Sequence, residues 1–467
     1  MDYRSLWIIV LQSITGGLYD RMSDLRHNVI PQTTSHHTRW IAAAALCLLF
    51  VGTNVGAQPK GDVSALMIHS IRIVGNDLTK DYIILREMSE QVGDTLDLDK
   101  IEYDKKRIYS LALFNRVDID YSVKGNEADL IVRVHERWYL YPFPILGFKY
   151  GDLKKLYYGL GLVHTNFRGR NEKVYFSFAL GYDRWLSLTY QNPKILDHDD
   201  IFFRLSLITA RVQSLNPDKG IYQQQNHGVA VTLGKRFGLY TLLTATGGYE
   251  IWQVSDIAAG RTVAANGRDA FGSLGVNYSY DSRDVREYAT EGSYLSLSIM
   301  KYGLGAGVDF FRYGYDARTY IPILGGDVLA GRIHGQFTSG GPVPAYRDTY
   351  FGHHERIRGY FSKIVEGEDL VGGNVEVRIP ILSPRYYEFK AIPIPEFRIW
   401  RYGLYAALFA DAGKTWFRSE GFYGRPWYSG VGAGLHFLLP YSIIVRTEVA
   451  VNRSGRTEFI ATFDAAF

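Results

Sequence analysis

The chain has 467 residues, of which 15% are aromatic, and it contains 48 glycines. Charged residues make up 21% and the mean hydropathy is −0.11. These values exclude a membrane protein built from apolar helices, and they suit a β-rich protein whose strands alternate between apolar and polar surroundings. The net charge of +4 is small and is not gathered into a basic stripe, so we expect no nucleic-acid partner. A single cysteine excludes an intrachain disulfide and a multi-cysteine metal site.

The start of the chain has the anatomy of an exported protein. An apolar run at 40–51 is about a dozen residues long, which is too short to span a membrane. Small residues at 55–57 then offer a cleavage site. We therefore predict that residues 1–57 are an N-terminal extension with a signal peptide, and the long lead before the apolar run favours a later start at Met22.

The pattern of residues 67–136 predicts a small α+β domain. A short first strand ends in a glycine–asparagine turn. Thr79 is placed to cap a first helix and Asp97 to cap a second, whose apolar residues repeat on one face. Two alternating segments follow, at 117–123 and 130–134, and each is typical of a half-buried strand. The predicted order is therefore β-α-α-β-β.

Short sequence matches add to this order. They are Ile71, the run Val74-Gly75-Asn76, the pair Leu113-Phe114 and the stretch from Val132 to Glu136. Together with the element order they resemble a POTRA domain, and a generic α+β module is the alternative. Such a domain has a sheet with an exposed edge, which captures extended polypeptides through main-chain hydrogen bonds. The resemblance implies a periplasmic domain that receives unfolded or secreted clients, with periplasmic accessory proteins as possible further partners.

From residue 138 to 467 the chain alternates between apolar and polar residues in segments of roughly ten, the signature of a transmembrane barrel. In the last segment Phe459, Phe463 and Phe467 fall on one face, and Glu458 falls on the other. The predicted strands are 138–149, 155–167, 172–182, 184–192, 199–213, 221–236, 239–253, 267–282, 292–302, 305–320, 324–339, 370–382, 402–415, 426–438, 441–452 and 456–467. We therefore predict a transmembrane antiparallel β-barrel of about 16 strands, closed so that no strand edge meets lipid.

A set of short motifs runs through this region. They are Asp281 to Asp284 with Thr290 and Gly292, the loop motif Ile357-Arg358-Gly359-Tyr360, Glu376 followed by Pro380, the strand motif Phe409, Asp411, Gly413 and Trp416, and the terminal Phe467. Their order resembles that of the POTRA-plus-β-barrel superfamily of outer-membrane assembly and secretion proteins, which includes BamA/TamA-like proteins and the bacterial surface antigen family. The resemblance implies a location in the outer membrane of a Gram-negative bacterium, in contact with the lipid bilayer. It also implies that the loop arginine is functional, and that Phe463 and Phe467 belong to a C-terminal signal for barrel insertion.

Arg358 lies in a loop, residues 340–369, that we expect to fold into the barrel. Its guanidinium presents a planar fork of donors that matches carboxylates. The expected partners are Glu376 and Asp411, because both occupy inward-facing positions of predicted strands. The alternative is that this pairing only braces the barrel, which is compatible with a functional loop.

Two prolines, Pro142 and Pro144, lie near the first predicted barrel strand and lack backbone N–H groups. Because they are two residues apart, both missing donors point toward the same neighbour. We hypothesise that they weaken pairing between the first and last strands, so that the barrel can part sideways and template an incoming strand. Alternatively, the prolines belong to the linker that precedes the barrel.

These features favour a protein that assists the insertion and assembly of other proteins in the outer membrane, without covalent chemistry and without a cofactor. A secretion pore of the two-partner type with one dedicated substrate is an alternative, and so is a passive porin. We predict no enzymatic activity, because no nucleophile and base stand at a recognisable spacing. The run His353-His354-Glu355 does not indicate a metal site, because adjacent residues of an extended chain point to opposite sides.

Overall fold

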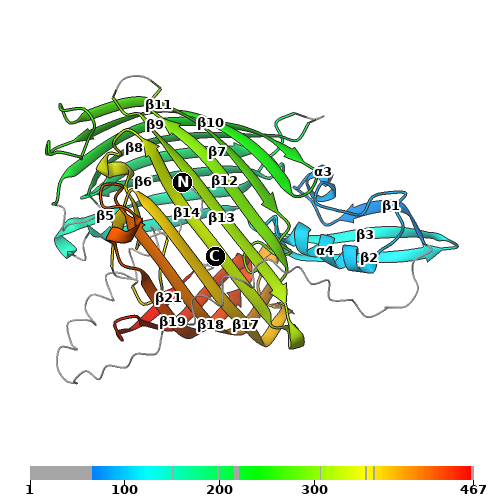
Figure 1. The fold of residues 1–467 in the computed structure, drawn as a ribbon. Coiled ribbons are helices and arrows are strands. Elements are labelled where there is room, and N and C mark those ends of the chain that lie inside the picture. The colour runs from blue at the N-terminus through cyan, green and yellow to red at the C-terminus, as the bar shows by residue number, and fades with distance from the viewer. Residues whose placement is uncertain are drawn as a thin grey trace.

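The computed structural model describes residues 66–149, 152–196, 199–214, 220–304, 307–352, 355–360 and 363–463. The predicted signal region at 1–57, His353, His354 and the terminal Phe467 lie outside the described residues. A small N-terminal domain and a large curved sheet make up the described part (Figure 1). None of the helices in these ranges is long and apolar enough to cross a membrane.

The small domain has the predicted β-α-α-β-β order. Its elements are β1 (Met67–Val74), α3 (Asp81–Leu85), α4 (Leu98–Tyr109), β2 (Phe114–Lys124) and β3 (Glu127–Glu136). The sheet runs β1-β3-β2, with β1 parallel and β2 antiparallel to the central strand. Helix α4 begins as predicted, because the Asp97 carboxylate accepts hydrogen bonds from the backbone N–H groups of Asp99 and Lys100. Ile101 and Ile108 on its apolar face are buried in the core of the domain.

Thr79 does not cap α3, contrary to the expectation. The residue before this helix is Lys80, and no side-chain hydrogen bond caps it. The Thr79 hydroxyl instead donates to Oε1 of Glu136 at 2.5 Å and accepts from Nδ2 of Asn166 at 2.9 Å. A carboxylate from β3 and an amide from the large sheet thus replace the local cap, and they tie the two parts of the chain together.

A buried carboxylate in the small domain makes its stability depend on pH. Glu90 is 1% exposed, and neither of its carboxylate oxygens has a hydrogen-bond partner among the described residues. The Nζ atom of Lys100 lies 3.9 Å from Oε1. Burial raises the pKa of Glu90 above its ordinary value of 4.5. The stabilisation by the bound proton is therefore fully present below the ordinary pKa and is lost as the pH rises through the raised one.

We expect Glu90→Gln to slow amide exchange in α4 of the full chain at neutral pH, with a gain on the order of 1 kcal/mol, because a charged group no longer has to be buried. Near pH 4 the parent carboxyl is protonated, so the difference should disappear. Hydrogen exchange with mass spectrometry measures both. Glu102→Gln, at an exposed position of α4, is the control. Equal exchange in the two variants at neutral pH would contradict a destabilising charge at Glu90.

The large sheet contains 16 strands in chain order. They are β4 (Leu140–Phe148), β5 (Leu156–Phe167), β6 (Glu172–Gly181), β7 (Arg184–Asn192), β8 (Ile201–Gln213), β9 (Gln223–Phe237), β10 (Thr241–Val254), β11 (Arg268–Asp281), β12 (Gly292–Tyr302), β13 (Phe310–Pro322), β14 (Val328–Gly340), β17 (Asp369–Glu388), β18 (Ile399–Trp416), β19 (Tyr428–Leu439), β20 (Ile443–Asn452) and β21 (Thr457–Thr462). Neighbouring strands are antiparallel. The predicted number and order of barrel strands are therefore confirmed.

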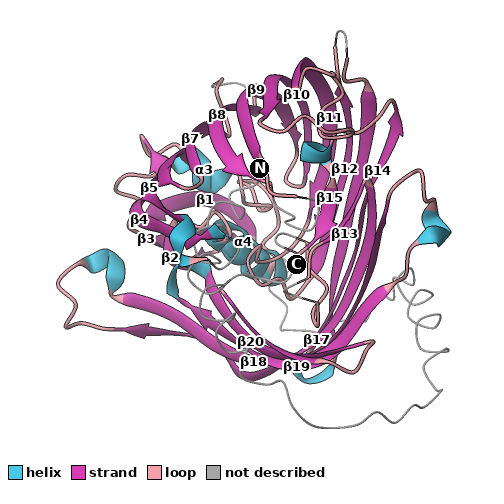
Figure 2. Ribbon diagram, turned by 90° about the vertical axis from the view of Figure 1, so that its left-hand side faces the viewer, coloured by secondary structure: helices cyan, strands magenta, loops and turns pink. Residues whose placement is uncertain are grey.

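Side chains alternate between the two faces of this sheet. On the last two strands Val449 and Phe459 are 45% and 54% exposed, whereas Arg446 and Glu448 are buried. The sheet curves round an interior that is seen end-on in Figure 2. An apolar outer face with buried polar residues on the inner face is the arrangement that a transmembrane barrel requires.

The two end strands of the sheet, β4 and β21, do not form a ladder with each other in the described residues, which differs from the expected closure. The carbonyl of Tyr139, just before β4, accepts a hydrogen bond from the N–H of Thr165 of β5. Because successive residues of a strand direct their backbone groups to opposite sides, Pro142 and Pro144 face the other, unpaired edge. Both prolines lie within β4, so the linker alternative is wrong. In the described residues β21 has 6 residues, and the two prolines of β4 present no N–H donor on the side away from β5.

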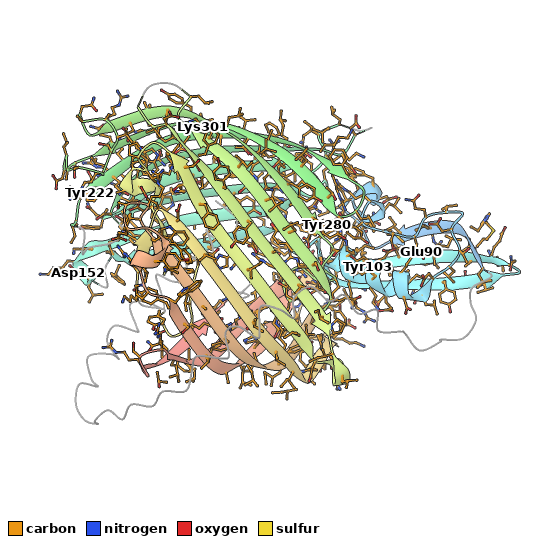
Figure 3. The ribbon with its side chains drawn as sticks, viewed as in Figure 1. Glu90, Tyr103, Asp152, Tyr222, Tyr280 and Lys301 are labelled. Carbon is orange, nitrogen blue, oxygen red and sulfur yellow. The ribbon has the colours of Figure 1, made fainter. Side chains whose placement is uncertain are left out.

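The small domain packs against one end of the barrel, where turns connect the strands (Figure 1). Tyr103 of α4 and Tyr280 of β11 both lie at this junction (Figure 3). The buried carboxylate of Glu87 binds Arg107 of its own domain at 2.8 Å and Arg236 of β9 at 2.6 Å. Charge pairs buried across the junction hold the domain in one orientation, because separating them would leave a charge buried without a partner.

Candidate functional site

The connection between β14 and β17 lies inside the barrel. It contains a turn of 3-10 helix at Ala345–Arg347 and a two-stranded ribbon of β15 (Thr349–Phe351) and β16 (Val365–Gly367). Figure 2 shows β15 within the curve of the sheet. We call residues 341–368 the lumen loop. It covers most of the segment 340–369 that we expected to fold inward.

The lumen loop carries Arg358 into a pocket of carboxylates. Nε and Nη2 of Arg358 donate to the two oxygens of Asp411, each at 2.7 Å. Nη1 donates to Glu376 at 2.8 Å and also to Glu448 at 2.9 Å. The backbone N–H of Arg358 donates to Asp411 at 3.0 Å. The structure thus brings together the three residues expected to meet, and it adds Glu448 from β20.

This pocket excludes water. Arg358 is 5% exposed, Glu376 is 0% exposed and Asp411 is 3% exposed. The guanidinium carbon of Arg358 lies 3.5 Å from the centre of the Phe409 ring, which covers one face of the group. Buried ion pairs of this kind gain little net stability, but removing one partner costs about 3–5 kcal/mol because the remaining charges are left buried.

The other motif residues shape the space around Arg358. Gly359 has a φ of 95°, a left-handed conformation that favours glycine, and its carbonyl accepts a hydrogen bond from Nδ2 of Asn452 at 2.8 Å. A Cβ atom on Gly413 would come within 2.8 Å of Ile357, so this glycine makes room for the loop. The Tyr360 ring packs edge-on against Tyr428 with 5.0 Å between ring centres.

Trp416 lies farther along β18 and does not contact Arg358. It is 6% exposed, its ring centre is 6.0 Å from that of Phe337, and it packs against Phe422 at 5.0 Å. Its strand position pairs with Asp369 at the end of the lumen loop. Trp416 therefore packs in the barrel wall where the loop rejoins the sheet.

The predicted seam residues lie away from the arginine pocket. Pro142 and Pro144 are in β4, and Phe463 directly follows β21.

Four residues of the pocket were not predicted from the sequence: Arg378, His436, Arg446 and Glu448. Nε of Arg378 donates to Glu376 at 2.8 Å, and Nε2 of His436 lies 3.2 Å from Glu448. Arg446 is 1% exposed and 4.0 Å from Glu448, with no hydrogen-bond partner for its guanidinium in the part of the chain that the structure describes. The alternation along β20 indicates that Arg446 and Glu448 point into the barrel, but it does not indicate which side chains they contact there.

The pocket is balanced in charge. Its guanidinium groups are Arg358, Arg378 and Arg446, and its carboxylates are Glu376, Asp411 and Glu448. Glu376, His436 and Glu448 also present ligating atoms within 4.8 Å of one another, the spacing that a metal ion needs. Because two arginines already donate to these carboxylates, cationic side chains occupy the place that a metal would take.

A second set of contacts holds the lumen loop to the opposite wall of the barrel. Tyr346 donates to Asp269 of β11 at 2.7 Å and stacks on Trp252 of β10, with 4.4 Å between ring centres. Arg347 pairs with Glu250 of β10. The lumen loop is therefore fixed at both sides and crosses the interior as a plug.

Comparison with known proteins gives this architecture a family. A model for the Omp85 superfamily domain matches residues 166–454, more than half of the chain. The chain belongs to the Omp85 superfamily. A POTRA model, described as a surface antigen variable number repeat, matches residues 66–137. The small domain is thus POTRA-like, and the large sheet is an Omp85-type β-barrel.

Two curated relatives carry the name outer membrane protein assembly factor BamA. The one from Nitratidesulfovibrio vulgaris is 24% identical over 328 residues, covering 66% of this chain and 40% of its own length. The one from Neorickettsia risticii is 24% identical over 355 residues, covering 69% of this chain and 46% of its own length. The chain thus spans less than half the length of these relatives.

Two solved structures share the fold. The structure of BamA from Haemophilus ducreyi lacking POTRA domains 1–3 is 18% identical with a TM-score of 0.52, covering 85% of this chain and 83% of that one. CdiB from Escherichia coli is 12% identical with a TM-score of 0.52, covering 86% of this chain and 75% of that one. Both likenesses extend across the POTRA-like domain and the barrel together.

Proposed function

We propose that this Omp85 protein assists the insertion and assembly of other proteins in the outer membrane of a Gram-negative bacterium, with its POTRA-like domain in the periplasm. The observation that carries the proposal is that β4 and β21, the two end strands of the sheet, form no ladder with each other in the described residues. Backbone groups without partners are costly in lipid, so this edge is primed to bind another strand. A client strand that adds there enters the membrane already hydrogen-bonded.

The POTRA-like domain offers a second edge for clients. Strand β2 lies at the outside of the sheet order β1-β3-β2. Its far end is open and includes two exposed apolar side chains, Tyr121 at 42% and Val123 at 51%. An extended client can add to this edge through main-chain hydrogen bonds with little demand on its sequence. The domain thus holds unfolded clients close to the barrel, and any periplasmic accessory protein would act at this side.

A secretion pore for one dedicated polypeptide is the second candidate. The lumen loop is held in the barrel by side-chain contacts at both walls, such as Arg358 with Asp411 and Tyr346 with Asp269, so it can withdraw without breaking the barrel. A passive porin fits less well, because the same loop crosses the interior. The roles differ in planar bilayers: steady large conductance favours a porin, and conductance that appears only with a bound polypeptide favours secretion.

The test of the proposed function is the folding of a urea-denatured outer-membrane barrel into liposomes that contain the purified full chain. We expect faster folding than in empty liposomes, because the protein supplies a hydrogen-bonding edge within the bilayer. Liposomes with heat-denatured protein are the control. The proposal is wrong if clients fold at the same rate in both preparations while the full chain remains folded.

The prolines of β4 give a sharper test of the seam. We expect the double variant Pro142→Val and Pro144→Val to slow client folding, because two restored N–H donors allow β4 to pair with β21, at about 0.5–1.5 kcal/mol for each hydrogen bond. Hydrogen exchange at 457–462 should slow at the same time. Pro322→Val, at the end of β13 away from the seam, is the matched control. Unchanged exchange at β21 would show that the prolines do not keep the edge open.

A further inference from the structure

The turn between β11 and β12, residues 282–291, is held together by hydrogen bonds to one buried carboxylate. The carboxylate of Asp284 is fully buried, and its Oδ1 accepts hydrogen bonds from the backbone N–H groups of Val285 and Thr290, at 2.8 and 2.9 Å. Its Oδ2 accepts from the hydroxyl of Thr290 at 2.5 Å. The backbone N–H of Asp284 donates to the carbonyl of Glu291 at 3.1 Å. The turn therefore moves as one rigid piece.

One side of this turn belongs to the POTRA-like domain. The Ser110 hydroxyl, at the end of α4, donates to the carbonyl of Asp284 and accepts from the N–H of Arg286, each at 3.1 Å. Lys106 pairs with the Asp284 carboxylate at 3.2 Å. Val285 is 5% exposed and is packed into the apolar core of the domain. A displacement of the domain would therefore pull directly on the turn.

The other side of the turn reaches across the barrel interior. Tyr288 is 2% exposed and packs among Tyr405, Leu438 and Ile444 of β18, β19 and β20. Its ring centre lies 4.1 Å from the guanidinium carbon of Arg378, and its hydroxyl lies 2.9 Å from Nδ1 of His436. The next residue also contributes, because the Ala289 carbonyl accepts a hydrogen bond from Nη1 of Arg378 at 2.9 Å.

Both contacts of Tyr288 lead to Arg358. Arg378 donates to one oxygen of Glu376, whose other oxygen accepts from Nη1 of Arg358. His436 contacts Oε1 of Glu448, the same atom that accepts from Nη1 of Arg358. Two residues thus separate Tyr288 from the loop arginine on each of two routes. The turn is also in direct contact with the POTRA-like domain.

We infer that the turn 282–291 couples docking of the POTRA-like domain to retention of the lumen loop, with Tyr288 as a positioning residue for the carboxylates that bind Arg358. When the domain is docked, the turn holds Arg378 and His436 in place, and these orient Glu376 and Glu448. When the domain moves away, the turn loses its anchor and the loop arginine is held less tightly. The inference goes beyond the proposed function, because it concerns the protein without any client.

The test follows the release of the lumen loop in the purified full chain, reconstituted in liposomes and exposed to trypsin. Release is measured as the rate of cleavage after Arg356 and Arg358, and mass spectrometry identifies the resulting peptides. We expect Tyr288→Phe, which keeps the ring but removes the hydroxyl, and Ser110→Ala each to raise this rate by about two- to thirtyfold, the range of coupling through packed contacts. Tyr278→Phe on the outer face of β11 and Ser122→Ala on β2 are the matched controls.

The double variant of Ser110→Ala and Tyr288→Phe distinguishes a shared route from two separate effects. We expect it to cleave no faster than the faster single variant, because both changes break the same chain of contacts. Rates that multiply in the double variant, or single variants that match the parent, would overturn the inference. Circular dichroism of each variant shows whether the barrel is folded.

Linkage makes the coupling reciprocal and supplies a second measurement that does not depend on the Tyr288 variants. Arg358→Ala should raise tryptic cleavage after Arg107, a residue 2% exposed whose Nη1 donates to the carbonyl of Asp281 in the docked state. Unchanged cleavage after Arg107, in a variant whose loop is released, would overturn the coupling. Both readouts are independent of client folding, so they separate failure of this inference from failure of the proposed function.

Discussion

Replacing Arg358 with alanine should release the lumen loop and abolish most of the assembly of clients, while the barrel itself stays folded. The variant loses the four hydrogen bonds that the guanidinium donates to Asp411, Glu376 and Glu448, and it keeps the one from its backbone N–H. It also leaves two arginines facing three carboxylates in a pocket that excludes water. Breaking a buried pair in this way costs about 3–5 kcal/mol, enough to turn a loop that is almost always seated into one that is mostly released.

Two measurements check this expectation: the folding rate of a denatured client in liposomes, and tryptic cleavage of the lumen loop. Arg358→Lys should give an intermediate result, because an ammonium keeps the charge but cannot span Asp411 with two parallel hydrogen bonds. Arg268→Ala, an exposed arginine at the start of β11, controls for loss of charge. If Arg358→Ala releases the loop but clients fold normally, the pairing only braces the barrel.

The sequence predicts the barrel well because its signal is local. Alternation with a period of two marks each strand regardless of what the strand pairs with, and so the 16 strands appear in the right order. The ends are less well placed: β17 reaches Glu388 and β18 begins at Ile399, both beyond the predicted bounds. These extensions contain bulges near Leu382, where the register shifts and the alternation is interrupted.

Contacts across the interior leave no such local signal. Glu448 lies 90 positions from Arg358 in the chain, and Tyr288 lies 148 positions from His436. Alternation shows only that a residue points inward, whereas the neighbour it meets depends on barrel curvature and on the path of the lumen loop. The Thr79 hydroxyl shows the same limit, since its tertiary partner Glu136 replaces the helix cap that its position predicts. Inward-facing positions were enough to suggest Glu376 and Asp411 as partners of Arg358, but they did not distinguish Glu448 from the other inward-facing residues.

Gly430→Ala should displace the lumen loop without removing any charge. Gly430 lies on β19, paired with Asp411 on one side and Asn452 on the other. A Cβ atom at this position would overlap the carbonyl oxygen of Arg358, so the loop backbone has to move away from the wall. The strand itself tolerates alanine, because Gly430 does not have a positive φ. Overpacking of this kind costs about 1–3 kcal/mol, and here the loop bears most of it.

The variant therefore separates the position of Arg358 from its charge. We expect the lumen loop of Gly430→Ala to be cleaved roughly 5- to 150-fold faster than that of the parent, the rate equivalent of this cost, with client folding slowed in proportion. Gly247→Ala on β10 is the matched control, since an added Cβ meets open space there. Suppose that Arg358→Ala disrupts assembly and Gly430→Ala leaves both loop and assembly unchanged. The hydrogen bonds of the guanidinium would then be strong enough to displace the backbone of β19. The close backbone contact at Gly430 would not be needed to hold the lumen loop in the barrel.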